Sequence, residues 1–154
     1  MHRINWTRLM IGGLSAGLVL NVLDSLVNNF LLADQWAAAM QALGKTAEPT
    51  AVAMVVFYIL GFLIGIFAVW LYAAIQPRYG AGPRTAVYAG LSVWLFAYLI
   101  SSVAPMVLGI LPPGLLGIMI AAGLVEVLAA TLLGAWLYRE EDVPEFRSAW
   151  AAGA

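Results

Sequence analysis

Two acidic residues, Asp24 and Glu126, lie inside stretches that are long and apolar enough to cross a bilayer, and no Lys, Arg or His shares those stretches. A carboxyl group at membrane depth costs at least about 2.5–3.5 kcal/mol on insertion scales, so it normally marks a site or a buried contact. Because no cationic side chain offsets its charge, we expect Glu126 to be largely protonated unless a cation binds. The chemistry that this arrangement allows is proton or cation binding, with Asp24 as an outer relay.

The same two residues also have a purely structural interpretation, which stays open. A protonated Glu126 can donate a hydrogen bond to a neighbouring helix, in the same chain or in a partner subunit. Asp24 is closer to the interface, where water can solvate an ionised carboxylate.

Further polar residues extend the stripe on which Asp24 lies. Asn21, Asp24 and Asn28 follow one another at steps of three and four residues, which places them on one face of a helix. Interhelical hydrogen bonds of such amides contribute only about 0.6 kcal/mol on average, so the asparagines fit helix contacts as well as a site. On the later spans, Tyr58, Tyr98 and Ser101 lie on faces that lipid would not favour.

We expect these faces to meet in the interior and to form a polar cleft that opens to the outside and ends at Glu126. At a rise of about 1.5 Å per residue, Glu126 lies roughly 20 Å from the outer end of its span. The candidate proton, cation or ligand site consists of Glu126, Asp24, Asn21, Asn28, Tyr58, Tyr98 and Ser101.

Small residues recur along the spans in a pattern typical of close helix packing in lipid. The candidate packing positions are Gly13, Gly17, Gly61, Gly65, Gly123 and Gly134. Packing within the chain and a face for dimer formation are both compatible with this pattern.

The composition excludes several classes of protein. The chain is 64% hydrophobic and 10% charged with a mean hydropathy of +0.94, so its solvent is lipid. A net charge of −1 gives no reason to expect nucleic acid binding. Without cysteine, and with His2 as the single histidine, the sequence has no ligand set for haem, an iron–sulfur cluster or a catalytic metal. We therefore expect neither a metal nor a cofactor.

The elements that must position the site residues are four spanning helices, which makes the expected fold an all-α, antiparallel four-transmembrane-helix bundle. The spans are expected at about 9–32, 51–75, 85–111 and 114–138. A short helix over about 34–44 is expected in the outer loop, either in the membrane interface or packed on top of the bundle. One transmembrane domain would then cover 1–139, followed by a flexible cytoplasmic tail over 140–154.

Basic residues indicate the orientation of these spans. Arg3, Arg8, Arg78, Arg84, Arg139 and Arg147 lie on one side, and Lys45 alone lies on the other. By the positive-inside rule, both termini are expected to be cytoplasmic.

Two segments carry a resemblance to a family. The stretches DQWAAAM (34–40) and WLYAAIQPRYG (70–80) resemble small four-helix membrane proteins of unknown function that are widespread in bacteria. The resemblance implies a multi-pass protein of the bacterial inner membrane, and it implies no activity. Small multidrug exporters differ, because their essential Glu lies in the first span, whereas here the first span carries Asp24.

Two functions remain open from the sequence. The first is a non-enzymatic accessory or scaffold subunit of a membrane assembly. As partners of the chain we expect the lipid bilayer together with further copies of the chain or a larger membrane complex. The alternative is a proton- or cation-coupled carrier of a small amphipathic molecule or lipid, using Glu126 and Asp24. An intramembrane enzyme is disfavoured because these acids are about 10 Å apart along the membrane normal and no nucleophile accompanies them.

Overall fold

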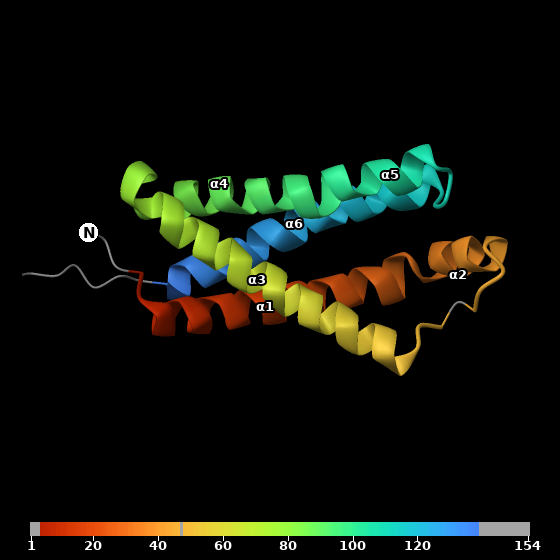
Figure 1. The fold of residues 1–154 in the computed structure, drawn as a ribbon, viewed down its shortest axis with the longest axis horizontal. Coiled ribbons are helices and arrows are strands. Elements are labelled where there is room, and N and C mark those ends of the chain that lie inside the picture. Colours follow the sequence, from red (N-terminus) through yellow and green to blue (C-terminus); the bar gives the residue numbers. More distant parts are fainter. Residues whose placement is uncertain (1–3, 47, 139–154) are drawn as a thin grey trace, which may run out of the picture.

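The computed structural model describes residues 4–46 and 48–138, and this part of the chain is helical without a strand (Figure 1). The elements are α1 (Trp6–Leu26), η1 (Val27–Leu31), α2 (Ala33–Ala42), α3 (Ala51–Tyr79), α4 (Pro83–Trp94), η2 (Leu95–Ile100), α5 (Ser101–Val107) and α6 (Pro113–Leu137). Both η1 and η2 are single stretches of π-helix that continue an α-helix. The predicted tail over 140–154, and the residues Arg3, Arg139 and Arg147, lie outside the described residues.

Within the described residues, four continuous helices are long and apolar enough to cross a membrane. They run from Trp6 to Leu31, Ala51 to Tyr79, Pro83 to Val107 and Pro113 to Leu137. The fold class is thus helical, with the four apolar helices that the hydropathy pattern predicts. We call the end of the molecule at which α1 begins and α6 finishes the terminal end, and the opposite one the α2 end.

The helix boundaries are set by capping residues. Asn5 accepts a hydrogen bond from the main-chain nitrogen of Arg8 at 3.1 Å, and Thr50 caps α3 in the same way through Ala53 at 3.2 Å. These bonds satisfy main-chain donors that a helix start would leave unpaired. Helix α6 begins with a proline at its first position, where a missing N–H costs nothing.

Two helix ends differ from the prediction. Helix α3 continues past 75 to Tyr79 and includes Pro77, which has no N–H and therefore cannot donate to the carbonyl of Ala73. The turn after α3 is made by Gly80 and Gly82, whose φ angles of 84° and 137° favour glycine. The third long helix stops at Val107 rather than at 111.

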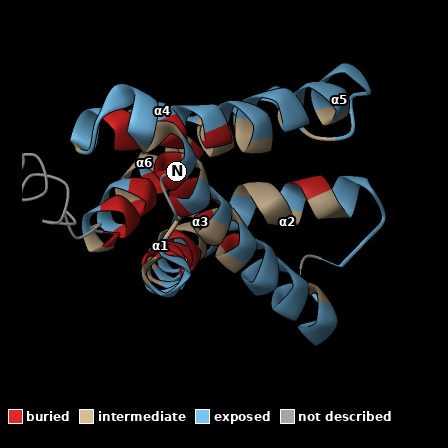
Figure 2. Cartoon of the chain, turned by 60° about the vertical axis from the view of Figure 1, so that its left-hand side comes forward, coloured by how far each residue is buried: buried red, intermediate tan, exposed pale blue. Residues whose placement is uncertain are grey.

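The core lies in the terminal half of the molecule (Figure 2). Helix α1 packs against α3 and α6, and α4 packs against α6 and α3. Buried side chains from all four meet there, among them Leu9, Val69, Ala89 and Val127. Small and medium side chains at these positions allow the helices to approach one another closely.

The closest approach is the crossing of α1 and α3. A Cβ atom added to Gly65 would come closer than 3.0 Å to main-chain atoms of Gly13 and Gly17. One turn earlier on α3, the amide of Asn21 occupies the space beside Gly61. These four glycines therefore serve packing within the chain, and neither pair is available as a face for another molecule.

Beyond this crossing, α3 separates from the other helices toward the α2 end (Figure 1). Its first ten residues, Ala51 to Leu60, are exposed apart from the half-buried Ala53. The short helix α2 lies in the segment where a helix over 34–44 was expected, and it packs on the start of α6 through Ala39 and Leu115. The packing thus resembles the second of the two positions considered for this helix, on top of the bundle.

Candidate functional site

Glu126 is the most buried acid among the described residues. It lies in the middle of α6 and is 3% exposed. The hydroxyl of Tyr98, on η2, donates a hydrogen bond to its Oε2 atom at 3.4 Å. This distance is longer than the usual 2.5–3.0 Å for an O–H···O bond, so the contact is a weak one. The structure thus brings together two of the residues that the sequence singled out.

Asp24 is the third member of this group. It lies on α1, is half-buried, and is near enough to interact electrostatically with both Tyr98 and Glu126. No Lys, Arg or His is present in the expected spans to compensate the two acids. Side chains from α1, η2 and α6 therefore form one cluster, which we call the acid cluster: Asp24, Tyr98 and Glu126.

Tyr98 is positioned by features of two elements. A Cβ atom on Gly123 of α6 would collide with its ring, so only glycine lets the ring lie against α6 at this level. One turn earlier, Trp94 donates from Nε1 to the main-chain oxygen of Ile120 at 2.8 Å. Together these contacts fix the rotation of the third long helix against α6 and aim Tyr98 at Glu126.

Sequence reasoning did not identify the π-helical segments or the role of Trp94. In a π-helix the main-chain bonds skip one residue further than in an α-helix, which leaves carbonyl groups in need of a donor. At η2 the hydroxyl of Ser101 donates to the carbonyl of Ala97 at 2.5 Å and more weakly to that of Tyr98 at 3.1 Å, and the hydroxyl of Ser102 donates to the carbonyl of Tyr98 at 2.6 Å. Ser101 was expected at the site, and here its hydroxyl serves its own helix. The pair of adjacent serines was the sequence feature that could have indicated this π-helical segment.

An equivalent arrangement is found at η1. Asn28 donates from Nδ2 to the carbonyl of Asp24 at 2.9 Å, and Asn29 donates to that of Ser25 at 2.8 Å. The Oδ1 atom of Asn28 also accepts a hydrogen bond from Nε1 of Trp36 at 2.8 Å. Asn28 therefore connects helix α2 to the acid-bearing helix, and its side chain also interacts with the carboxyl group of Asp24.

Asn21 and Tyr58 meet where α1 faces α3, and they do not belong to the acid cluster. The Nδ2 atom of Asn21 donates to the main-chain oxygen of Tyr58 at 3.1 Å and so ties α1 to α3 just beyond their crossing. The Tyr58 side chain is 48% exposed and lines a groove on the flank of these two helices, away from the acid cluster. Tyr58, which was expected at the site with Glu126, thus lines this groove.

The acid cluster contains two carboxyl groups and a phenol, which can share or exchange protons and whose oxygen atoms can contact a cation. Among the residues that the structure describes, no group of three or more His, Cys, Asp or Glu is placed to hold a metal ion. The cluster can thus hold a proton, bind a monovalent cation, or join three helices.

Comparisons of the chain with protein-family models, with curated proteins and with solved structures found no match.

Proposed function

We propose that the chain is a multi-pass membrane protein of the bacterial inner membrane, with four antiparallel spans and both termini in the cytoplasm. The four long apolar helices support this proposal, and consecutive ones run in opposite directions in Figure 1. Of the basic residues in the described part, Arg8, Arg78 and Arg84 lie at the terminal end and Lys45 lies at the α2 end. This distribution is the one that the positive-inside rule associates with a cytoplasmic terminal end.

We further propose that the protein is a non-enzymatic accessory or scaffold subunit of a membrane assembly. The supporting observation is a face of small residues on the first half of α6. Gly114, Gly117 and Ala121 are exposed and lie three and four residues apart, on one side of the helix. A Cβ atom added to either glycine would meet nothing within 4 Å. Small residues allow a second helix to approach closely in lipid, so this face can accept a helix of a partner.

The test is purification from native membranes in a mild detergent after crosslinking, with the wild-type chain and two variants. We expect a partner protein to be recovered with the wild type and lost with Gly117→Leu, because leucine fills the open face. Ala104→Leu is the matched control, since Ala104 is an exposed small residue on a different helix, α5. Recovery of a monomer or homo-oligomer alone would contradict the proposal.

The acid cluster favours a second candidate, a proton- or cation-coupled carrier of a small amphipathic molecule. Glu126 has a neutral hydrogen-bond partner and a second acid nearby, which is an arrangement suited to taking up and releasing a proton. Glu126→Gln keeps the size and the polarity of the side chain while removing the titrating group. Flux into proteoliposomes should be lost in this variant, and an unchanged flux and pH response would remove Glu126 from any such mechanism.

A further inference from the structure

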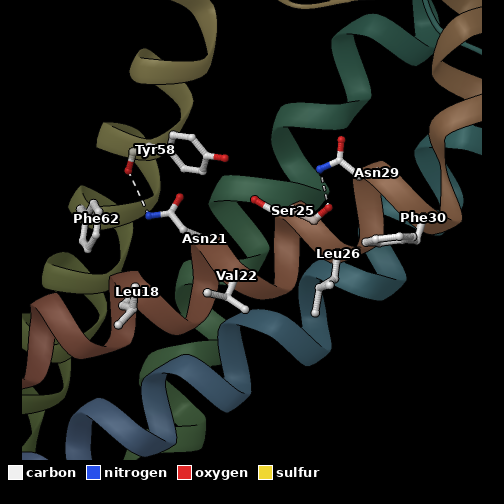
Figure 3. A pocket seen from close by; sticks show the side chains of 9 residues that line it. All are labelled: Leu18, Asn21, Val22, Ser25, Leu26, Asn29, Phe30, Tyr58 and Phe62. Atoms are coloured by element: carbon white, nitrogen blue, oxygen red, sulfur yellow. Dashed lines mark hydrogen bonds between the residues drawn. The ribbon is translucent and has the colours of Figure 1, made fainter. Parts of the chain in front are cut away.

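The groove on the flank of α1 and α3 is separate from the acid cluster. It has a volume of about 380 Å³ and lies where α3 begins to diverge from α1 (Figure 3). Asn21 forms the wall between the groove and the bundle interior, because its amide bridges to the main chain of Tyr58. The groove also lies apart from the small-residue face of α6, so it does not depend on either proposed function.

One edge of the groove carries a row of neutral polar groups. Asn21, Ser25 and Asn29 follow at steps of four residues along α1 and η1 and extend over about 12 Å. Tyr58 lies across from them on α3, and Figure 3 shows its hydroxyl and the oxygen of Asn21 directed into the same space.

These groups retain hydrogen-bonding capacity that the described residues do not satisfy. Asn21 is only 8% exposed, yet its Oδ1 atom accepts no hydrogen bond from the described part of the chain. The same holds for Oδ1 of Asn29, whose Nδ2 donates to the main chain. The hydroxyls of Ser25 and Tyr58 likewise make no hydrogen bond within residues 4–46 and 48–138. At membrane depth, unsatisfied polar groups are costly, so a ligand that bonds to them gains stability.

The other edge of the groove is apolar. Leu18, Val22 and Leu26 also follow at steps of four residues and run parallel to the polar row, and Phe62 closes the wall on α3. The groove thus presents a polar and an apolar side along its whole length. A molecule that matches it must be amphipathic from side to side rather than from head to tail.

Charge and size restrict the occupant further. No acidic or basic side chain lines the groove, so a charged ligand would have no counter-charge there. The volume is within the range of roughly 300–1,000 Å³ that is typical of small-molecule sites.

We propose that the α1–α3 groove binds an uncharged molecule with a hydrocarbon framework on one side and hydroxyl groups along the other, which enters from the surrounding lipid. The hydroxyls would bond to Oδ1 of Asn21 and Asn29 and to the hydroxyls of Ser25 and Tyr58, and the hydrocarbon would lie on the leucine side. A steroid polyol has this shape and this distribution of polar groups.

The experiment measures equilibrium binding of tritium-labelled methyl cholate, an uncharged trihydroxy steroid ester, to the full chain in nanodiscs, with empty nanodiscs subtracted. We expect saturable binding that is weakened about two- to tenfold by Tyr58→Phe and, separately, by Ser25→Ala, the effect of one lost hydrogen bond. Tyr58→Phe keeps the main-chain oxygen that Asn21 uses, so the helix contact is preserved. Tyr88→Phe and Ser92→Ala are matched controls on the exposed face of α4 and should bind as the wild type does.

Competing ligands test the two parts of the proposal. One part is that the ligand is uncharged and carries hydroxyl groups, and the other is that its polar groups lie along one side. The hydroxyl-free ester methyl cholanate, the anion cholate and the head-to-tail lipid monoolein should each displace methyl cholate only at concentrations at least tenfold higher. Absence of saturable binding, equal binding by the Tyr58→Phe and Ser25→Ala variants, or displacement by monoolein as effective as by unlabelled methyl cholate would overturn the proposal.

Discussion

At the scale of single residues, the contact between Tyr98 and Glu126 is the one that can be measured most directly. Hydrogen bonds between side chains in membrane proteins contribute about 0.6 kcal/mol on average and at most about 1.7 kcal/mol. The Tyr98–Glu126 bond is long, at 3.4 Å, and it joins two uncharged groups if the acid is protonated. Its contribution should therefore be at the lower end of this range.

We predict that a double-mutant cycle with Tyr98→Phe and Glu126→Met gives a coupling energy of about 0.6 kcal/mol or less. The measurement is the free energy of unfolding in mixed micelles, obtained by titration with a denaturing detergent. A coupling energy above about 1.7 kcal/mol would contradict a neutral contact, because hydrogen bonds to charged groups contribute about 1.5–3 kcal/mol.

A control cycle uses Tyr88→Phe and Ser92→Ala on α4. The hydroxyl of Ser92 donates to the main-chain oxygen of Tyr88, and neither substitution removes that oxygen. The coupling energy of this pair should be close to zero. A comparable value in both cycles would mean that the first one reports a general effect of the substitutions.

At the scale of the helices, the crossing of α1 and α3 decides how the molecule opens. The two helices touch through main-chain atoms at Gly13, Gly17 and Gly65, and they diverge on the α2 side of this point. The first ten residues of α3, Ala51 to Leu60, therefore lie outside the core. The position of the crossing explains why a groove forms beside Tyr58.

We predict that Gly65→Ala lowers the free energy of unfolding by about 2 kcal/mol, because the added methyl group has no room against α1. Gly117→Ala is the matched control, since a methyl group there meets nothing within 4 Å. It should raise the stability by up to about 1 kcal/mol through helix propensity. Equal effects of the two substitutions would show that the helices do not cross where the structure places them.

Helix α2 is held by one side-chain hydrogen bond and by the apolar cluster that includes Ala39 and Leu115. We predict that Trp36→Phe, which keeps the ring but loses the donor to Asn28, increases amide hydrogen exchange over Ala33–Ala42 by about two- to tenfold. Trp70→Phe on the exposed side of α3 should leave this exchange unchanged. Exchange in the Trp36→Phe variant that equals the wild type would show that the apolar contact with Leu115 alone holds α2.

At the scale of the whole molecule, hydropathy was sufficient to find the four long helices, because a span needs only length and apolarity. Hydropathy could not predict where the helices cross. Tyr58 precedes Gly61 and Gly65 by three and seven residues on α3, but it lies on the α2 side of the crossing and so lines a groove.

The candidate site, like the fold, was predictable only in part. The burial of Glu126 and its proximity to Asp24 result from placing polar faces inward, and the structure has both. The use of Asn28 and Ser101 to bond main-chain carbonyls was not predictable, because a π-helical segment changes the main-chain register by a single residue. Such a change leaves the pattern of apolar residues almost unaltered.

The orientation in the membrane gives the last prediction. The terminal end carries the described arginines and the α2 end carries Lys45, so the α2 end should face the outside.

The chain has no cysteine, which allows single cysteines to report on each end. Glu48→Cys and Ala81→Cys are suitable, because both positions are exposed and neither substitution removes a basic residue. A membrane-impermeant maleimide applied to intact spheroplasts should label Glu48→Cys, and it should label Ala81→Cys only after permeabilisation. Labelling of Ala81→Cys without permeabilisation would reverse the orientation, and with it the side from which Asp24 and the α2 end are reached.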